Sequence, residues 1–194
     1  DMTAPLKVLV ADDETIIAMG IETTLAKMGH AVVGRARTGG EAVAKAVELS
    51  PDLVIMDVKM PDMDGIEASR RILAHRAVPI VILSAYSDSD LIERADAVGV
   101  SNYLVKPVTE ADLRPALTLA ISRFRQLHAL EEEVGSLKEA LRTRKLVERA
   151  KGILMDRKGL SEADAFKTLQ QMSRNQNIPM AKLAESILAA HSLL

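Results

Sequence analysis

The apolar segment Leu53-Val54-Ile55-Met56 ends directly on a carboxylate, Asp57. Four consecutive aliphatic residues are typical of a strand that is buried on both faces of a parallel sheet. Because a buried, unpaired carboxylate is costly, Asp57 must lie at the carboxyl end of this strand, where α/β sheets bind ligands. This segment therefore favours a fold with a parallel sheet and places a candidate site at one edge of it.

Strand and helix patterns alternate over the first 125 residues, and Gly29, Pro51, Pro79 and Gly99 separate them. The expected strands span residues 7–11, 31–35, 53–56, 80–84 and 103–105, and the expected helices span 15–28, 40–49, 65–74, 89–97 and 110–124. Five such units predict an α/β doubly wound, five-stranded parallel sheet with right-handed connections. The second strand is the least apolar, so we expect it at an edge.

The composition excludes several classes of protein. Cysteine is absent, which rules out disulfides and thiolate chemistry. No apolar run approaches the ~18 residues that a membrane span needs, and the N-terminal residues lack the apolar core of a signal peptide. We therefore expect a cytoplasmic protein without a membrane partner.

The net charge of −2 is unevenly distributed along the chain. Residues 142–194 contain ten Lys or Arg and five Asp or Glu, a net charge of +5, whereas residues 1–141 contain 15 and 22, a net charge of −7. Opposite signs indicate two modules with different partners, and the basic module is a candidate for binding nucleic acid.

Polar side chains lie at the ends of four of the apolar strands. Asp12 and Asp13 follow the first strand and Asp57 follows the third, and such a cluster of carboxylates needs a hard cation, for which Mg²⁺ or Mn²⁺ is suited. Lys106 and Ser84, at two further strand ends, can bind the oxygens of a phosphoryl group while Asp57 acts as nucleophile. Taken singly, Asp12 or Asp13 fits a helix N-cap and Lys106 fits a surface lysine; their joint placement indicates a phosphoryl site.

Residues 6–125 resemble the receiver domain of two-component response regulators. The resemblance rests on Val10-Ala11-Asp12-Asp13-Glu14, on Asp57-Val58-Lys59-Met60-Pro61-Asp62-Met63-Asp64-Gly65, on Ser84-Ala85 and on Lys106-Pro107. It implies a flavodoxin-like sheet with strand order 2-1-3-4-5. It also implies a phosphoprotein that is not an enzyme, beyond promoting its own phosphotransfer and dephosphorylation.

The same resemblance implies roles for individual residues. Asp57 would accept a phosphoryl group from a sensor histidine kinase. Asp12, Asp13, Asp57 and the backbone carbonyl of Lys59 would bind Mg²⁺. Ser84 would turn toward the phosphoryl group, and Tyr103 would be an aromatic switch whose ring changes exposure. The added negative charge would recruit Ser84 and Lys106 and so bias a distant surface.

The helix that closes the receiver pattern continues beyond it. Between residues 113 and 150, Pro115, which we expect in a first helical turn, and Gly135 are the only helix-breaking residues. An apolar series recurs there at alternating spacings of three and four: Leu127, Leu130, Val134, Leu137 and Leu141. This pattern predicts a coiled coil and a homodimer, although an amphipathic helix packed on its own domain would also produce it. We therefore expect a receiver at 1–123, a coiled-coil linker at 124–142 and a helical domain at 143–194.

The last fifty residues predict three short helices at 143–156, 163–174 and 180–190, with Ser161 as an N-cap and Asp164 at the third helical position. Residues 140–190 resemble an ANTAR domain, an RNA-binding antiterminator module. The motifs are Arg144-Lys145-Leu146-Val147-Glu148-Arg149-Ala150-Lys151-Gly152-Ile153-Leu154-Met155, Gly159-Leu160-Ser161-Glu162-Ala163-Asp164-Ala165-Phe166-Lys167-Thr168-Leu169 and Lys182-Leu183-Ala184-Glu185-Ser186-Ile187. The resemblance implies binding to RNA stem-loops and prevention of transcription termination.

The candidate RNA-binding residues are five basic side chains and one aromatic: Arg144, Lys145, Arg149, Lys151, Lys182 and Phe166. Phe166 fits either an aromatic in the core of the helices, which we favour, or a stacking partner for an unpaired base. Two other outputs remain open. Three short basic helices also suit a DNA-binding module, although residues 180–190 are more apolar than a DNA-recognition helix usually is. Alternatively, the tail is a surface that binds a protein partner. We expect phosphorylation of Asp57 to release or pair the tails of a homodimer.

Overall fold

The chain divides into two compact units in a computed structural model that describes residues 4–85 and 89–192. The first unit comprises residues 1–128 and the second comprises residues 129–194. One helix contributes residues to both units, and each unit is described here by itself.

The first unit contains the expected parallel sheet. Its strands are β1 (Lys7–Ala11), β2 (Ala31–Ala36), β3 (Leu53–Asp57), β4 (Ile80–Ser84) and β5 (Asn102–Val105), in the order β2-β1-β3-β4-β5. All four pairings are parallel. The doubly wound five-stranded sheet and the edge position of β2 are confirmed. Asp57 is the last residue of β3 itself, one residue beyond the expected strand end.

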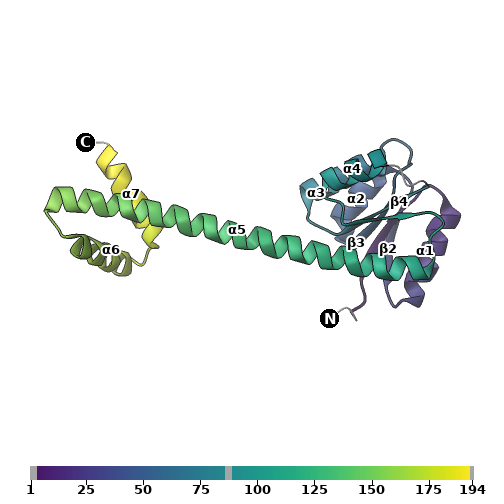
Figure 1. Cartoon of the computed structure of the whole chain (residues 1–194), viewed down its shortest axis with the longest axis horizontal. Helices are drawn as coiled ribbons and strands as arrows, with labels where there is room; N and C mark the ends of the chain where they lie inside the picture. The colour runs from purple at the N-terminus through teal and green to yellow at the C-terminus, as the bar shows by residue number, and fades with distance from the viewer. Residues whose placement is uncertain (1–3, 86–88, 193–194) are drawn as a thin grey trace. The chain divides into compact units, whose positions relative to one another are not determined.

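Helices cover both faces of this sheet (Figure 1). They are α1 (Thr15–Lys27), α2 (Gly39–Leu49), α3 (Gly65–His75), α4 (Ser89–Val98) and the first part of α5 (Glu110–Lys158). Side chains alternate between the faces along each strand. Leu53 and Ile55 belong to the core beneath α1 and α5, whereas Val54 and Met56 belong to the core beneath α2 and α3. Because the central strands are buried on both faces, polar side chains are confined to their ends.

Helix α5 is continuous from Glu110 to Lys158, 49 residues in all. The helix expected at residues 143–156 is therefore not a separate element but the last part of α5. Pro115 lies in the second turn of α5 rather than in the first, where we expected it. The proline N atom there forfeits one backbone hydrogen bond near the start of a long helix, and the remainder of α5 is helical nonetheless. None of the helices in the described part of the chain combines the length and the apolar character that crossing a membrane requires.

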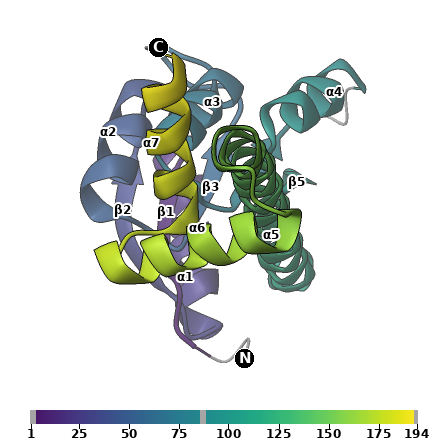
Figure 2. The same ribbon diagram turned by 90° about the vertical axis from the view of Figure 1, so that its left-hand side faces the viewer.

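The second unit packs the last part of α5 with α6 (Glu162–Gln176) and α7 (Met180–Ser192), and Figure 2 shows α6 and α7 crossing each other. Its core is made of small and aliphatic side chains: Val147, Ala150, Leu154, Ala165, Leu169, Leu183 and Ala184. Ser161 caps α6, because its Oγ accepts a hydrogen bond of 3.1 Å from the Asp164 N–H. Asn177 ends α6 in the left-handed conformation with φ 52°.

Candidate functional site

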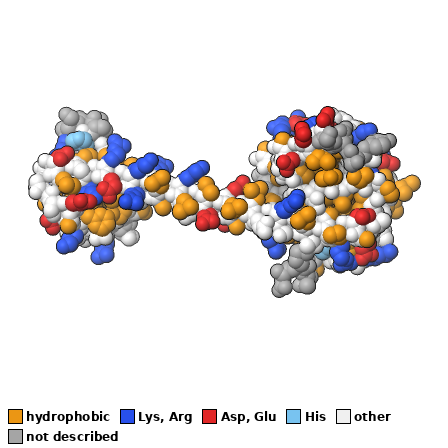
Figure 3. Space-filling model, viewed as in Figure 1, with side chains coloured by type: hydrophobic (Ala, Val, Ile, Leu, Met, Phe, Trp, Pro, Cys, Tyr) orange, Lys and Arg blue, Asp and Glu red, His pale blue; other side chains and the backbone are white. Residues whose placement is uncertain are grey.

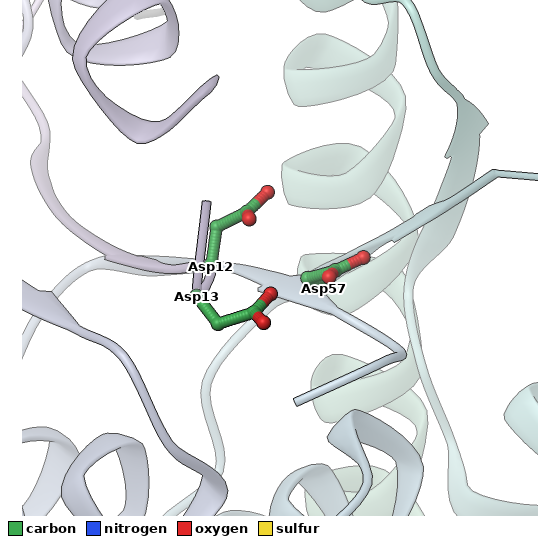
Figure 4. Close-up of side chains that lie close together, drawn as sticks. All are labelled: Asp12, Asp13 and Asp57. Atoms are coloured by element: carbon green, nitrogen blue, oxygen red, sulfur yellow. The ribbon is translucent and has the colours of Figure 1, made fainter. Parts of the chain in front are cut away.

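The three predicted carboxylates meet at one edge of the sheet. Asp12 and Asp13 follow β1 and Asp57 ends β3, and these strands are neighbours, with Ala11 paired to Met56. One ligand atom from each carboxylate lies within 4.8 Å of the other two (Figure 4). Asp12 and Asp57 are buried, and Asp13 is half-buried. The structure therefore brings together the acidic residues that the strand-end argument selected.

Lys106, in the loop after β5, supplies the opposite charge. Its Nζ atom lies 2.8 Å from Asp12 Oδ2 and 3.1 Å from Asp57 Oδ1, and 12% of its side chain is exposed. Glu14 Oε1 lies farther away, at 3.7 Å. The ammonium is thus held between two buried carboxylates, which rules out its interpretation as a surface lysine.

Burial and charge shift the pKa values of this pair. Burial raises the pKa of the Asp57 carboxyl, and the Asp12 and Asp13 carboxylates act in the same direction, while Lys106 only partly opposes them. Burial alone would lower the pKa of the Lys106 ammonium, but the contacts with Asp12 and Asp57 more than offset it and raise that pKa. The site therefore retains the positive charge of Lys106 and disfavours the negative charge of Asp57.

Replacing Asp57 with asparagine should stabilise the protein in a pH-dependent way. With its pKa raised in the folded state, Asp57 holds its proton more tightly there than in the unfolded chain, so stability falls as the pH rises through this window. We expect Asp57→Asn to show a higher urea midpoint than the native chain at about pH 7.5 in chelator. The difference should narrow at a lower pH, as native Asp57 takes up its proton. A lower urea midpoint for Asp57→Asn than for the native chain at both pH values would contradict a raised pKa for Asp57.

The donor set fits a hard divalent cation. The oxygens of three carboxylates converge, and Asp12 Oδ1 is held in place by the Glu14 N–H at 2.9 Å. Asp12 Oδ2 is buried, and its contact with Lys106 lacks hydrogen-bond geometry, so it has no hydrogen-bond partner among the described residues. Oxygen ligands of this kind are those that Mg²⁺ prefers.

The acidic cluster opens into a cavity of about 580 Å³. The residues that line it are Asp13, Glu14, Asp57, Val58, Lys59, Ser84, Ala85, Asp90, Leu91, Arg94 and Lys106. Ser84 and Lys59, both expected from the sequence, therefore reach the same space as Asp57. Tyr103 is not among the lining residues; it lies on β5 and is half-exposed.

Helix α3 begins in close contact with the end of β3, the strand that carries Asp57. Gly65 begins α3, and its N–H donates to the Val58 carbonyl at 2.8 Å. A Cβ atom on Gly65 would lie 1.9 Å from the backbone carbonyl oxygen of Asp57, so only glycine fits. Asp64 precedes it as N-cap of α3, accepting from the Glu67 N–H at 2.8 Å.

Sequence reasoning missed two residues at the rim of the cavity. Arg94 of α4 lines the cavity, and its Nη2 atom donates to Asp64 Oδ2 at 2.8 Å. Asp64 carried a signal, because an aspartate before a helical pattern is a common N-cap. Arg94 carried none, since a basic residue on an amphipathic helix is ordinarily solvent-facing.

The predicted RNA-binding residues of the second unit differ in exposure. Arg144, Lys145, Arg149 and Lys182 are exposed. Phe166 is 40% exposed and, with Val147, Arg144 and Met180, lines a groove of about 560 Å³. Phe166 is therefore at the edge of the core rather than within it.

Lys151 is the exception among these residues, because only 9% of its side chain is exposed. Its Nζ atom lies 2.7 Å from Glu148 Oε2 and 2.7 Å from Glu162 Oε1, the latter at the start of α6. Hydrogen bonds to both glutamates raise the pKa of this ammonium. In this conformation Lys151 joins α5 to α6.

The apolar series on α5 is exposed. Leu127, Leu130, Val134, Leu137 and Leu141 all present large hydrophobic surface, and Figure 3 shows hydrophobic side chains at intervals along this part of the chain. An amphipathic helix packed on its own domain would bury such a series. The series instead leaves an apolar stripe without a covering element among the described residues.

Comparisons with known proteins agree with this architecture. A family model for the response regulator receiver domain matches residues 8–118, and one for the ANTAR domain matches residues 135–188. The transcriptional regulatory protein PdtaR of Mycobacterium tuberculosis is 50% identical over 188 residues, which cover 97% of this chain and 92% of the relative.

Solved structures are similar in fold. The signal receiver domain of a modulated diguanylate cyclase from Desulfovibrio desulfuricans is 29% identical with a TM-score of 0.59, covering 63% of this chain and 98% of that one. A CheX–CheY–BeF3–Mg²⁺ complex from Borrelia burgdorferi is 27% identical with a TM-score of 0.58, covering 64% of this chain and 92% of that one.

The parallel sheet of order 2-1-3-4-5, with an acidic cluster and a lysine at its carboxyl edge, defines a receiver fold. With the helical unit that follows, the chain belongs to the response regulators that combine a receiver domain with an ANTAR domain.

Proposed function

We propose that Asp57 accepts a phosphoryl group from a sensor histidine kinase and that this reaction switches the second unit to bind RNA stem-loops, preventing transcription termination. The observation that carries the proposal is the convergence of Asp57, two further carboxylates and Lys106 at the carboxyl edge of a receiver sheet, in a chain that also contains an ANTAR domain. The receiver promotes its own phosphotransfer and dephosphorylation and has no other catalytic role.

Each residue of the pocket has a defined part in the transfer. An Asp57 carboxylate oxygen attacks phosphorus while the bond from phosphorus to the kinase's histidine nitrogen breaks and its electron pair stays with the imidazole. Lys106, whose Nζ atom lies 3.1 Å from Asp57 Oδ1, binds an oxygen of the transferred group. The Ser84 hydroxyl binds a second phosphoryl oxygen. Pairing with Asp12 keeps the Lys106 ammonium charged and directed into the cavity.

Asp12, Asp13, Asp57 and the backbone carbonyl of Lys59 would hold Mg²⁺, and the buried Asp12 Oδ2, which lacks a hydrogen-bond partner in the described part of the chain, supports this ligand set. The cation would neutralise the carboxylates and the negative charge of the phosphoryl oxygens. A similar receiver structure contains both Mg²⁺ and BeF3, which also supports the assignment.

The output would need two copies of the chain. We propose that residues 124–142 form a coiled-coil linker between a receiver at 1–123 and an RNA-binding domain at 143–194. The exposed apolar stripe supports pairing along this linker.

Tyr103, half-exposed on β5, would transmit the state of the pocket by changing the exposure of its ring.

The exposed basic residues Arg144, Lys145, Arg149 and Lys182 would bind RNA phosphates, and Phe166 would stack on an unpaired base. Lys151 could contact RNA only after breaking its pairs with Glu148 and Glu162. We therefore expect Arg149→Ala to weaken RNA binding directly, and Lys151→Ala to act at least partly through the packing of α6 on α5.

Binding to a panel of short RNA hairpins tests the whole proposal. The native chain and Asp57→Asn are compared with and without acetyl phosphate and Mg²⁺, at a stated salt concentration. We expect phosphorylation to tighten hairpin binding in the native chain alone. If the chain binds no hairpin in any state, the RNA-binding output is wrong, while the assignment of the receiver domain still stands. Duplex DNA preferred over hairpins would favour a DNA-binding regulator, and salt-insensitive binding of a protein would favour a protein-interaction output.

The triple variant Leu127→Ala, Leu130→Ala and Val134→Ala tests the pairing step. Removing these two leucine side chains and one valine side chain should leave the urea midpoint of each unit nearly unchanged, since none of the three belongs to a hydrophobic core. We expect sedimentation of the phosphorylated variant to show a monomer and its RNA affinity to fall at least tenfold, because two linked sites bind more tightly than one. Leu119→Ala, which removes an exposed leucine outside the stripe, is the matched control. Unchanged RNA affinity in the triple variant would rule out the dimer.

A further inference from the structure

Arg94 places a guanidinium at the mouth of the phosphoacceptor cavity. It projects from α4, lines the cavity together with Asp57 and Lys106, and has 56% of its side chain exposed. The Asp57 side chain, in contrast, is 6% exposed and forms the floor. The two residues therefore lie at different depths of the same cavity.

The charge of Arg94 is not used to neutralise the acidic cluster. Lys106 is committed to Asp12 and Asp57, whereas Arg94 Nη2 donates to Asp64, which is outside the cavity lining and also caps α3. A guanidinium carries five N–H donors in a planar fork, so it can bridge Asp64 and a second anion. Asp64 holds this fork in position at the rim.

The geometry of phosphoryl transfer assigns a role to the rim. Attack by a floor oxygen of Asp57 requires the leaving atom to lie opposite, so the leaving group faces the mouth of the cavity. A cavity of about 580 Å³ falls in the range of small-molecule sites, which leaves room for a donor larger than the phosphoryl group alone.

We propose that Arg94 binds the acyl side of small acyl phosphates that phosphorylate Asp57 directly, and stabilises the charge that develops on the departing carboxylate. An Asp57 oxygen forms a bond to phosphorus, the bond from phosphorus to the acyl oxygen breaks, and its electron pair leaves with the carboxylate. No proton is needed on this leaving group. The inference rests on the proposed role of Asp57 as phosphoacceptor and adds a subsite for the donor.

A comparison of two phosphodonors isolates this effect. Acetyl phosphate releases an acetate anion, whereas phosphoramidate, already protonated on nitrogen, releases neutral ammonia. Phosphoprotein formation is followed by intact mass spectrometry in the presence of Mg²⁺, using the full chain and its variants Arg94→Gln, Arg94→Lys and Asp64→Asn. Asp64→Asn keeps the cap of α3 and the charge of Arg94 but removes the ion pair that positions the guanidinium, so it tests the positioning of Arg94 separately from its charge.

We expect Arg94→Gln to lower the second-order rate constant for phosphorylation by acetyl phosphate about tenfold. This is less than the loss expected for a fully buried hydrogen-bond donor, because the Arg94 guanidinium is half exposed. The rate constant with phosphoramidate should change less than twofold. Arg94→Lys should recover part of the loss. Asp64→Asn should lower the rate with acetyl phosphate, but by less than Arg94→Gln does, because Arg94 keeps its charge and loses only the partner that positions it.

An equal loss with both donors would overturn the inference, because it would show a general effect on the pocket, and so would native rates of Arg94→Gln with both. Failure of the native chain to react with either donor would instead overturn the proposed phosphoacceptor function, and this inference with it.

Discussion

Gly65→Ala is expected to lower the free energy of unfolding of the receiver unit by about 3 to 5 kcal/mol, which is large for a single substitution. The added Cβ atom would lie 1.9 Å from the Asp57 carbonyl oxygen and 2.9 Å from Met56 Cγ. The nearest obstacle is backbone at the end of a buried strand, so it cannot rotate away as a side chain would. Relief of the clash requires α3 or the end of β3 to move.

The same displacement should impair phosphorylation. A shift of about 1 Å at a reacting group can cost a factor of about 100 in rate. Urea denaturation measures the loss of stability. The rate of phosphoprotein formation with acetyl phosphate, corrected for the folded fraction, measures the loss of phosphorylation activity. Gly20→Ala is the matched control, since a Cβ on this helical glycine meets nothing within 4 Å, and it should be neutral or stabilising by up to about 1 kcal/mol. Similar midpoints for the two variants would refute the role of Gly65.

Lys106→Met should destabilise the protein by about 3 to 5 kcal/mol in chelator at neutral pH, the usual cost of removing one partner of a buried ion pair. The ammonium, 12% exposed, lies between Asp12 Oδ2 and Asp57 Oδ1. Its loss leaves these carboxylates facing each other without a counter-charge, and methionine fills the space without replacing the charge.

A double-mutant cycle separates this charge effect from packing. Asp12→Asn combined with Lys106→Met removes one carboxylate along with the ammonium, so we expect it to recover most of the stability lost in Lys106→Met. Mg²⁺ should also rescue the single variant in part, because a cation that binds only the folded state stabilises it. A loss below about 1 kcal/mol for Lys106→Met would mean that the pair is solvated, as surface pairs are.

The receiver pocket was largely predictable from the sequence. Strand ends can be located from apolar runs, and in a parallel sheet the carboxyl ends of all strands lie along one edge. Asp12, Asp57, Ser84 and Lys106 therefore had to approach one another once the strand order was known. Their motifs also resemble those of the receiver family, and the comparisons confirm that this chain belongs to it.

Other features depended on contacts between distant residues. Lys151 lies in a basic stretch, as an exposed RNA ligand would, yet the structure buries it against Glu162, eleven residues later on another helix. The rim position of Arg94 depends on Asp64, thirty residues earlier. The requirement for glycine at position 65 follows from an approach of two backbones that no local pattern reveals.

The sequence alone was enough to locate the strands and helices of the receiver, the strand ends that carry carboxylates and lysine, and the heptad spacing between Leu127 and Leu141, because periodicity and composition act locally along the chain. It did not show that this heptad series is exposed, nor that the helix expected at 143–156 is the last part of α5. Only the tertiary structure decided which charges are buried, which pairs they form and which side chains line the cavity. Burial and pairing are properties of neighbours in space, and residues such as Glu162 for Lys151 and Asp64 for Arg94 become neighbours only when the helices that bear them pack together.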